Sequence, residues 1–206
     1  MKLNYSGLGK SQVSVLNQIA KFSSESGFYL AGGTALSLYF GHRKSVDLDW
    51  FTSKKIEDAL DLAARIKEHG IKFSVASIAT GTLHGTIAKI RVTFLEFKYP
   101  LLQPSQFISQ PGFYLASLDD LACMKLSAIA QRGARKDFCD IYALGIKHRP
   151  LSEMLELYKA KFGVKEIAHV VYGLNYFDDA ETERMPNMLW DVSWTTIKKT
   201  IQAWLK

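Results

Sequence analysis

The stretch "LAGGTALSLYFGHRKSVDLDWF", residues 30–51, determines the fold because it combines several structural signals in a short space. The apolar run 28–31 is typical of a buried strand, and Gly32-Gly33 interrupts it. Residues 34–40 have the pattern of a two-turn helix, and residues 46–51 form a second strand-like run that contains two carboxylates. The sequence therefore predicts a strand, a glycine turn, a short helix and a second strand.

Asp47 and Asp49 are separated by one residue in the second predicted strand. Side chains alternate along a strand, so both carboxylates point to one face, with Cα atoms about 6.6–6.8 Å apart. Val46, Leu48 and Trp50 take the opposite face and are predicted to pack in the core. Two unpaired anions beside a core are costly, whereas a bound Mg²⁺ or Mn²⁺ removes that cost. We therefore predict that the aspartates are metal ligands; a solvated edge strand or loop is the alternative.

Residues on both sides of the short helix are of types that bind phosphate groups. Gly32 and Gly33 lack a Cβ and let the backbone approach a ligand, and Thr34 begins a helix whose amides and dipole favour an anion. Arg43 and Ser45 lie just before the aspartate strand, where they can orient a nucleotide or its phosphates. We predict that all five bind a nucleoside triphosphate (NTP), although Arg43 capping the loop is the alternative.

The rest of the chain divides into two parts. Further helices are predicted over 11–26 and 55–69, and further strands over 72–78, 85–90 and 91–99. A proline-containing connector is predicted over 100–113, followed by helices over 118–132, 136–146, 151–162, 164–176 and 193–205. The expected fold is α+β: a mixed β-sheet lobe with flanking helices over 1–105, then a helical C-terminal lobe over 106–206. The cleft between them is the expected site.

Charged residues occupy the apolar faces of two helices in the second part. Lys125 and Arg132 fall on the apolar stripe of one helix at 100° per residue, and Asp137 and Asp140 lie on or beside that of the next. The lysine and arginine could reach past the core to solvent, or the four could form a structural salt bridge. The functional interpretation places them in the cleft, where the cations contact phosphate or the aspartates.

Two motifs resemble a known family. The pattern Gly32-Gly33, then 13 residues, then Asp47-Leu-Asp49 is similar to the signature of the polymerase-β-type nucleotidyltransferase superfamily. The longer segment "GGTALSLYFGHRKSVDLDWF" more narrowly resembles the AbiEii/AbiGii-type toxin nucleotidyltransferases of bacterial abortive-infection and toxin–antitoxin systems. "KLSAIAQRGARKDFCDIYAL" resembles the second block of that family, and the resemblance extends over about 28–145. It implies catalytic roles for Lys125 and Asp137, and a further role for Asp140.

The resemblance implies a metal-dependent enzyme that transfers a nucleoside monophosphate from an NTP to an acceptor hydroxyl. Such enzymes usually add a third carboxylate from a neighbouring strand, for which Glu96 is the candidate metal ligand; a Glu96–Lys98 pair on an edge strand is the alternative. The expected acceptor is RNA, such as a tRNA end, and the expected protein partner is a cognate antitoxin. Transfer to a protein or small molecule, or a catalytically silent nucleotide-, RNA- or partner-binding module, are the alternatives.

The composition is consistent with a polyanionic ligand and indicates the cellular compartment. The formal net charge is +6 and the pI is about 9.2, which favours nucleotides or RNA. The two cysteines lack metal-ligand spacing and form no disulfide framework, as expected of a cytoplasmic protein. No signal-peptide pattern and no apolar run of about 18 residues occurs, so we expect no membrane association.

Overall fold

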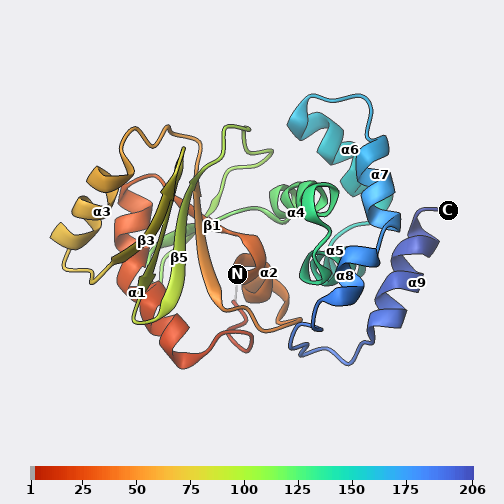
Figure 1. Cartoon of the computed structure of the whole chain (residues 1–206), viewed down its shortest axis with the longest axis horizontal. Coiled ribbons are helices and arrows are strands. Elements are labelled where there is room, and N and C mark those ends of the chain that lie inside the picture. Colours follow the sequence, from red (N-terminus) through yellow and green to blue (C-terminus); the bar gives the residue numbers. More distant parts are fainter. Residues whose placement is uncertain (1–2) are drawn as a thin grey trace.

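The computed structural model describes residues 3–206 as a mixed β-sheet with helices on both of its faces (Figure 1). In spatial order the seven strands are β3 (Ser74–Ala79), β4 (Thr82–Ile87), β5 (Ile90–Glu96), β2 (Asp47–Thr52), β1 (Tyr29–Ala31), β7 (Phe113–Leu115) and β6 (Gln106–Ile108). The central strand β2 pairs parallel with β5 and antiparallel with β1. The aspartate strand therefore lies in the middle of the sheet.

The helices form two groups around this sheet. The helices that precede or interrupt the strands are α1 (Lys10–Glu25), α2 (Gly32–Phe40) and α3 (Ala59–Glu68). The helices that follow the sheet are α4 (Leu118–Arg132), α5 (Arg135–Lys147), α6 (Leu151–Phe162), α7 (Ala168–Asn175), α8 (Asp178–Thr182) and α9 (Trp194–Trp204). Figure 1 shows α1 and α3 on one side of the sheet and the second group on the other, with α2 between the sheet and α4.

The predicted strand–helix–strand unit is present, with the helix beginning two residues earlier than expected. Helix α2 starts at Gly32, whose φ of +68° favours glycine, and the N-cap residue Ala31 provides no capping side chain. The first amides of the helix are therefore not satisfied by a cap. Gly41 ends the helix in the left-handed conformation, as the sequence predicted.

The two faces of β2 differ as alternation predicts. Leu48 and Trp50 are fully buried in the core that α1 covers, and Asp47 and Asp49 lie on the other face. The prediction for Val46 was wrong: it precedes the strand, and 63% of it is exposed. Alternation ends where strand pairing ends, so Val46 does not follow the pattern of its neighbours.

The sheet also extends further along the chain than the sequence suggested. Strand β7 pairs parallel with β1, and β6 pairs antiparallel with β7, so residues 106–115 belong partly to the sheet rather than to the connector or the helical lobe. Three-residue strands have too short a pattern to recognise among prolines; pairing with β1 stabilises β7, and pairing with β7 stabilises β6. A division into two lobes stays a prediction, but its helical part begins at Leu118.

The helical part follows the prediction closely at its start. Helices α4 and α6 have the predicted bounds, 118–132 and 151–162. The helix predicted over 164–176 is shorter, 168–175, and the short helix α8 was not predicted. Within the part of the chain that the structure describes, no helix combines the length and the apolar character that crossing a membrane requires.

Candidate active site

A pocket of about 700 Å³ lies between the aspartate-bearing face of the sheet and helix α4. Its two acidic residues are Asp47 and Asp49. The cationic residues that line it are Arg43, Lys44, Arg91, Lys125, Arg132 and Lys136. This excess of positive charge around two carboxylates suits a polyanionic ligand that arrives with a divalent cation.

The two aspartates have different environments within the pocket. Asp47 accepts two hydrogen bonds from the guanidinium of Arg91, at 2.7 and 3.0 Å. Asp49 is deeper: burial and the neighbouring charge of Asp47 raise its pKa, and the charges of Lys125 and Lys136 offset only part of this rise. Asp49 is thus an anion held in an unfavourable position, which a bound cation would relieve.

Glu96 does not join the aspartate pair, which corrects the prediction of a third metal ligand. In the parallel pairing of β2 with β5, Asp49 is opposite Thr93, whereas Glu96 is opposite Thr52 on the other face of the sheet. The Glu96 carboxylate instead accepts a hydrogen bond from the backbone amide of Ile56 at 3.2 Å. Alternation along β5 separates it from the pocket, and the side chains of β5 that share the face with the aspartates are not acidic.

The aspartate pair fits a magnesium ion that is held together with a substrate. Among residues 3–206 no group of three or more histidine, cysteine, aspartate or glutamate side chains could hold a metal. Mg²⁺ is commonly bound by one or two carboxylates, with substrate phosphates and water completing its coordination. Asp47 and Asp49 supply such a pair of hard oxygen ligands, and the cationic walls leave room for phosphates beside them.

The two predicted glycines line the pocket, and a Cβ at either position would collide with a neighbouring side chain. A Cβ on Gly32 would lie 2.8 Å from Oδ2 of Asp49, and a Cβ on Gly33 would lie 2.3 Å from Nη2 of Arg43. Both distances are far below van der Waals contact. The glycines therefore bring the uncapped start of α2 against one metal-ligand candidate and one cation, where its amides are available to an anion.

Thr34 is placed differently from the other predicted nucleotide-binding residues. It is buried, and its hydroxyl donates a short hydrogen bond to the backbone carbonyl of Asp47. The Ser45 hydroxyl, which does line the pocket, lies 2.8 Å from Thr34 Oγ1, and Gln12 Nε2 donates to the same Asp47 carbonyl at 3.2 Å. Thr34 and Gln12 thus fix the beginning of β2, which sets the position of Asp47.

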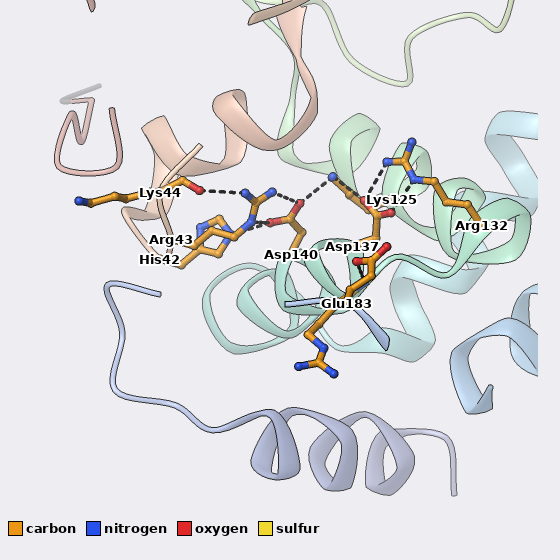
Figure 2. Close-up of polar contacts among 9 residues, drawn as sticks. His42, Arg43, Lys44, Lys125, Arg132, Asp137, Asp140 and Glu183 are labelled. Atoms are coloured by element: carbon orange, nitrogen blue, oxygen red, sulfur yellow. Dashed lines mark hydrogen bonds and ion pairs between the residues drawn. The ribbon is translucent and has the colours of Figure 1, made fainter. Parts of the chain in front are cut away.

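Behind the pocket, charged side chains form a continuous network (Figure 2). Asp140 is fully buried and accepts hydrogen bonds from Nε and Nη2 of Arg43, each at 2.7 Å. His42 Nε2 lies 2.7 Å from the same carboxylate, and Lys125 Nζ lies 2.6 Å from its other oxygen. Burial alone would raise the pKa of Asp140, but Arg43 and Lys125 hold it well below its ordinary value.

Lys125 connects this cluster to a second buried carboxylate, that of Asp137. The Lys125 ammonium donates to Asp137 at 2.8 Å, and Arg132 donates to both oxygens of Asp137, at 2.9 and 3.2 Å. Burial lowers the pKa of Lys125, but Asp140 and Asp137 more than compensate, so its pKa is raised and it stays protonated. It can act as a fixed cation and not as a general base.

The predicted meeting of the two cations with the two aspartates is thus present in the structure. Lys125 and Arg132 line the pocket, whereas Asp137 and Asp140 are completely buried behind it. The aspartates orient the cations and do not themselves reach a ligand. In this arrangement Arg43, Lys125 and Arg132 each present positive charge to the pocket while being held by an anion on the far side.

Sequence reasoning missed several members of the site. The sequence predicts only a strand around Arg91 and assigns no role to His42, because neither residue carries a local pattern that reveals its partner. The segment 187–190 was not assigned a role, yet it covers the loop before β2: Lys44 N donates to the Asn187 carbonyl at 2.8 Å, and Leu189 N donates to the His42 carbonyl at 2.8 Å. No signal in the sequence connects regions so distant.

Comparisons with known proteins identify a family for the segment that contains the pocket aspartates. Residues 14–109 match the family "Nucleotidyl transferase AbiEii toxin, Type IV TA system". The chain is 37% identical over 179 residues to an uncharacterized protein from Aquifex aeolicus (strain VF5), covering 85% of this chain and 86% of that protein. The family match contains the glycines and both pocket aspartates, and the buried charge network continues beyond it.

The fold is shared with solved structures of low sequence identity. MenT4, a nucleotidyltransferase toxin from Mycobacterium tuberculosis H37Rv, has a TM-score of 0.62 at 14% identity, over 94% of this chain and 82% of that one. The antibiotic-resistance factor ANT(2'')-Ia has a TM-score of 0.55 at 14% identity, over 76% of this chain and 93% of that one. These similarities confirm the predicted nucleotidyltransferase-like α+β fold. Residues 14–109 are an AbiEii domain, the domain of nucleotidyltransferase toxins from type IV toxin–antitoxin systems, and the chain is an NTP-dependent nucleotidyltransferase.

Proposed function

We propose that this protein transfers a nucleoside monophosphate from an NTP to a hydroxyl group of an RNA acceptor, tRNA among them, in a Mg²⁺- or Mn²⁺-dependent reaction. The observation that carries the proposal is the pocket itself, in which Asp47 and Asp49 face Lys125 and Arg132 beside the open start of α2. Carboxylates for a cation and fixed positive charges for phosphates are the two requirements of nucleotidyl transfer.

The residues of the chain act mainly by positioning and charge neutralisation. The amides at Gly32 and Gly33 and the cations Arg43, Lys125 and Arg132 hold the triphosphate, and Asp47 and Asp49 hold the divalent cation. That cation, when bound, neutralises phosphate charge and lowers the pKa of the acceptor hydroxyl. In the transfer itself the acceptor hydroxyl loses its proton to water and its oxygen attacks the α-phosphorus. The bond from the α-phosphorus to the oxygen that bridges it to the β-phosphate breaks, and pyrophosphate leaves.

The charge of the chain and its family match support the proposed acceptor, the compartment and the antitoxin partner. Six cations line the pocket and the net charge of the chain is +6, which favours a polyanionic acceptor such as RNA over a typical protein surface. Such a reaction would take place in the cytoplasm, where NTPs and tRNA occur. A toxin of a type IV system also implies a cognate antitoxin that counteracts this activity.

Incubation of the protein with each α-³²P-labelled NTP, Mg²⁺ and either total RNA or total protein tests the proposal. We expect label in RNA, and none with Asp47→Asn or Asp49→Asn. Label in protein would support transfer to a protein acceptor instead. Expression of the protein in cells gives a second measurement, the arrest of their growth. Absence of label with every NTP and acceptor, together with growth arrest that is the same for the wild type and both variants, would overturn the enzymatic proposal.

A further inference from the structure

The pocket has two chemically different ends on its sheet wall. Along β2, Asp47, Asp49 and Phe51 share one face, and their register partners on β5 are Arg91, Thr93 and Leu95. Beyond the end of β5, the amide of Phe97 donates to the Thr52 carbonyl at 2.8 Å, which continues the pairing. The wall is therefore charged at one end and aromatic and aliphatic at the other.

The helical wall changes in the same direction. Leu121 and Met124 line the pocket near the start of α4, and Lys125 and Arg132 follow towards its end. Asp120, in the first turn of α4, pairs at 2.6 Å with the buried Lys161, whose Nζ lies 5.5 Å from the centre of the Phe97 ring. The start of α4 therefore lies beside the aromatic end of the sheet.

The other end of α4 lies over the charged part of the sheet. Lys125 and Arg43 share the carboxylate of Asp140, and Lys125 and Arg132 share that of Asp137. Arg43 Nη2 lies beside Gly33 at the start of α2, and the neighbouring Gly32 lies beside Oδ2 of Asp49. Both walls thus place their charges together and their apolar groups together.

The aromatic end is preformed. The rings of Phe51 and Phe97 meet edge to face with centroids 5.9 Å apart, and Phe51 stacks on Tyr29 at 6.2 Å. Phe97 also contacts Phe162 edge to face at 6.4 Å. Both rings are partly buried and line the pocket, so each is held by neighbours on one side and open to a ligand on another.

We propose that Phe51, Leu95 and Phe97, facing Leu121 and Met124, form the binding site for the nucleobase of the NTP. Phe51 is two residues beyond Asp49, about 6.7 Å along the strand, so one sugar separates a base here from phosphates at the aspartates. A flat, uncharged base stacks on aromatic rings whatever its identity. These five side chains provide no hydrogen-bonding groups, so the site favours bases over bare phosphates without strong selection among the four. This inference rests on the proposed function.

A comparison of the affinities for two ligands distinguishes binding of the nucleoside from binding of the phosphates. Inorganic tripolyphosphate has the anionic chain but neither ribose nor base, so calorimetry of tripolyphosphate and of each NTP, with Ca²⁺ in place of Mg²⁺, measures the contribution of the nucleoside, and the Phe97 variants measure the share of the base in it. Phe97→Ala should weaken binding of every NTP roughly 5- to 150-fold, the effect of losing one stacked base. Binding of tripolyphosphate should not change. Phe97→Leu, which keeps the apolar volume, should show a smaller loss of the same kind.

The matched control is Phe107→Leu, since Phe107 lies on β6 outside the pocket and is 54% exposed. It should leave both affinities unchanged. Equal affinities of the wild type for NTPs and tripolyphosphate, or equal losses for both ligands in Phe97→Leu, would overturn the base site but leave the proposed function standing. Failure of the wild type to bind either ligand would refute the proposed function as well. Unchanged NTP affinity with weaker RNA binding in Phe97→Ala would assign these rings to the acceptor and overturn the inference.

Discussion

The ammonium of Lys125 lies 2.6 Å from Oδ2 of Asp140, and both side chains are buried. Asp140 also holds Arg43, which comes from the loop before β2, so the aspartate connects a cation of the sheet region to a cation of the helical region. The cations that line the pocket from the sheet region and from the helical region are thus aligned by one carboxylate.

Lys125→Ala should abolish most activity while the fold is retained. Asp140 keeps Arg43 and Asp137 keeps Arg132, so neither carboxylate is left without a cation. Loss of a fixed positive charge beside the transferred phosphate should lower kcat about 10²- to 10³-fold. Single-turnover kinetics and circular dichroism measure the two effects.

Arg149→Ala is the matched control for Lys125→Ala. Arg149 also pairs with a nearly buried carboxylate, that of Asp119, at 2.9 Å, and His148 remains to hold that carboxylate. It lies outside the pocket lining. Activity per folded molecule should therefore be unchanged in Arg149→Ala. Full activity in Lys125→Ala would show that the role of Lys125 is purely structural.

Asp140→Ala should destabilise the protein by about 3–5 kcal/mol, because Arg43 and Lys125 would be left as buried charges with fewer partners. Urea unfolding monitored by fluorescence measures this change.

Asp140→Asn tests the pH dependence of stability. The pKa of Asp140 is lowered in the folded state, so its stabilising contribution is complete above the unfolded value of about 3.9 and is lost as the pH falls below it. The free energy of unfolding should thus decrease less steeply on acidification in Asp140→Asn than in the wild type; equal slopes would contradict the role assigned to this carboxylate.

Asp49→Asn should have the opposite effect on stability. The raised pKa of Asp49 means that the folded protein disfavours its charged form, a cost that is present above the unfolded pKa. Replacing the charge with a neutral amide should leave Tm at pH 7 unchanged or higher, while abolishing transfer and weakening Mn²⁺ binding measured by electron paramagnetic resonance. A large decrease in Tm would show that the carboxylate is structural.

Removal of the metal from the wild type should have the same effect on activity. Chelation by EDTA should abolish wild-type activity, and added Mg²⁺ or Mn²⁺ should restore it.

Arg91→Ala tests the ion pair that Asp47 makes in the absence of a metal. The guanidinium is largely exposed, at 68%, so the pair is worth at most about 1 kcal/mol. Removing it should tighten binding of Mn²⁺ alone by up to about fivefold and should weaken binding of tripolyphosphate, because a cation of the pocket is lost. Unchanged Mn²⁺ affinity would show that Arg91 does not compete for Asp47.

Gly33→Ala should weaken NTP binding strongly, because its Cβ would come within 2.3 Å of Nη2 of Arg43 and displace the guanidinium. Gly9→Ala is the control: Gly9 lies at the N-cap of α1, and a Cβ there would meet no atom within 4 Å. Isothermal titration of both variants with NTP should show a loss for Gly33→Ala alone. Equal affinities would show that Arg43 can move without cost.

The sequence by itself determined the local elements and the residue types of the site. Strand alternation placed Asp47 and Asp49 on one face, and helical periodicity identified Lys125 and Arg132 as anomalous. The double glycine was expected as a turn before the helix, whereas it forms the first two residues of α2. The face of a strand or helix on which a side chain lies depends on residues a few positions away, so the spacing of residues in the sequence indicates it directly. The motifs also identified the family, because the chemistry needs those residues at those spacings.

Only the tertiary structure decided which of these groups meet. Strand register placed Glu96 on the far face and brought Arg91 to Asp47, and the packing of α5 placed Asp140 between Arg43 and Lys125. Pairing with β1 made a strand of residues 113–115, and pairing with that strand made one of residues 106–108, where the local pattern gave no indication. Such contacts join residues far apart in the chain, and their geometry is set by the sheet and helix packing as a whole, so no local pattern contains it.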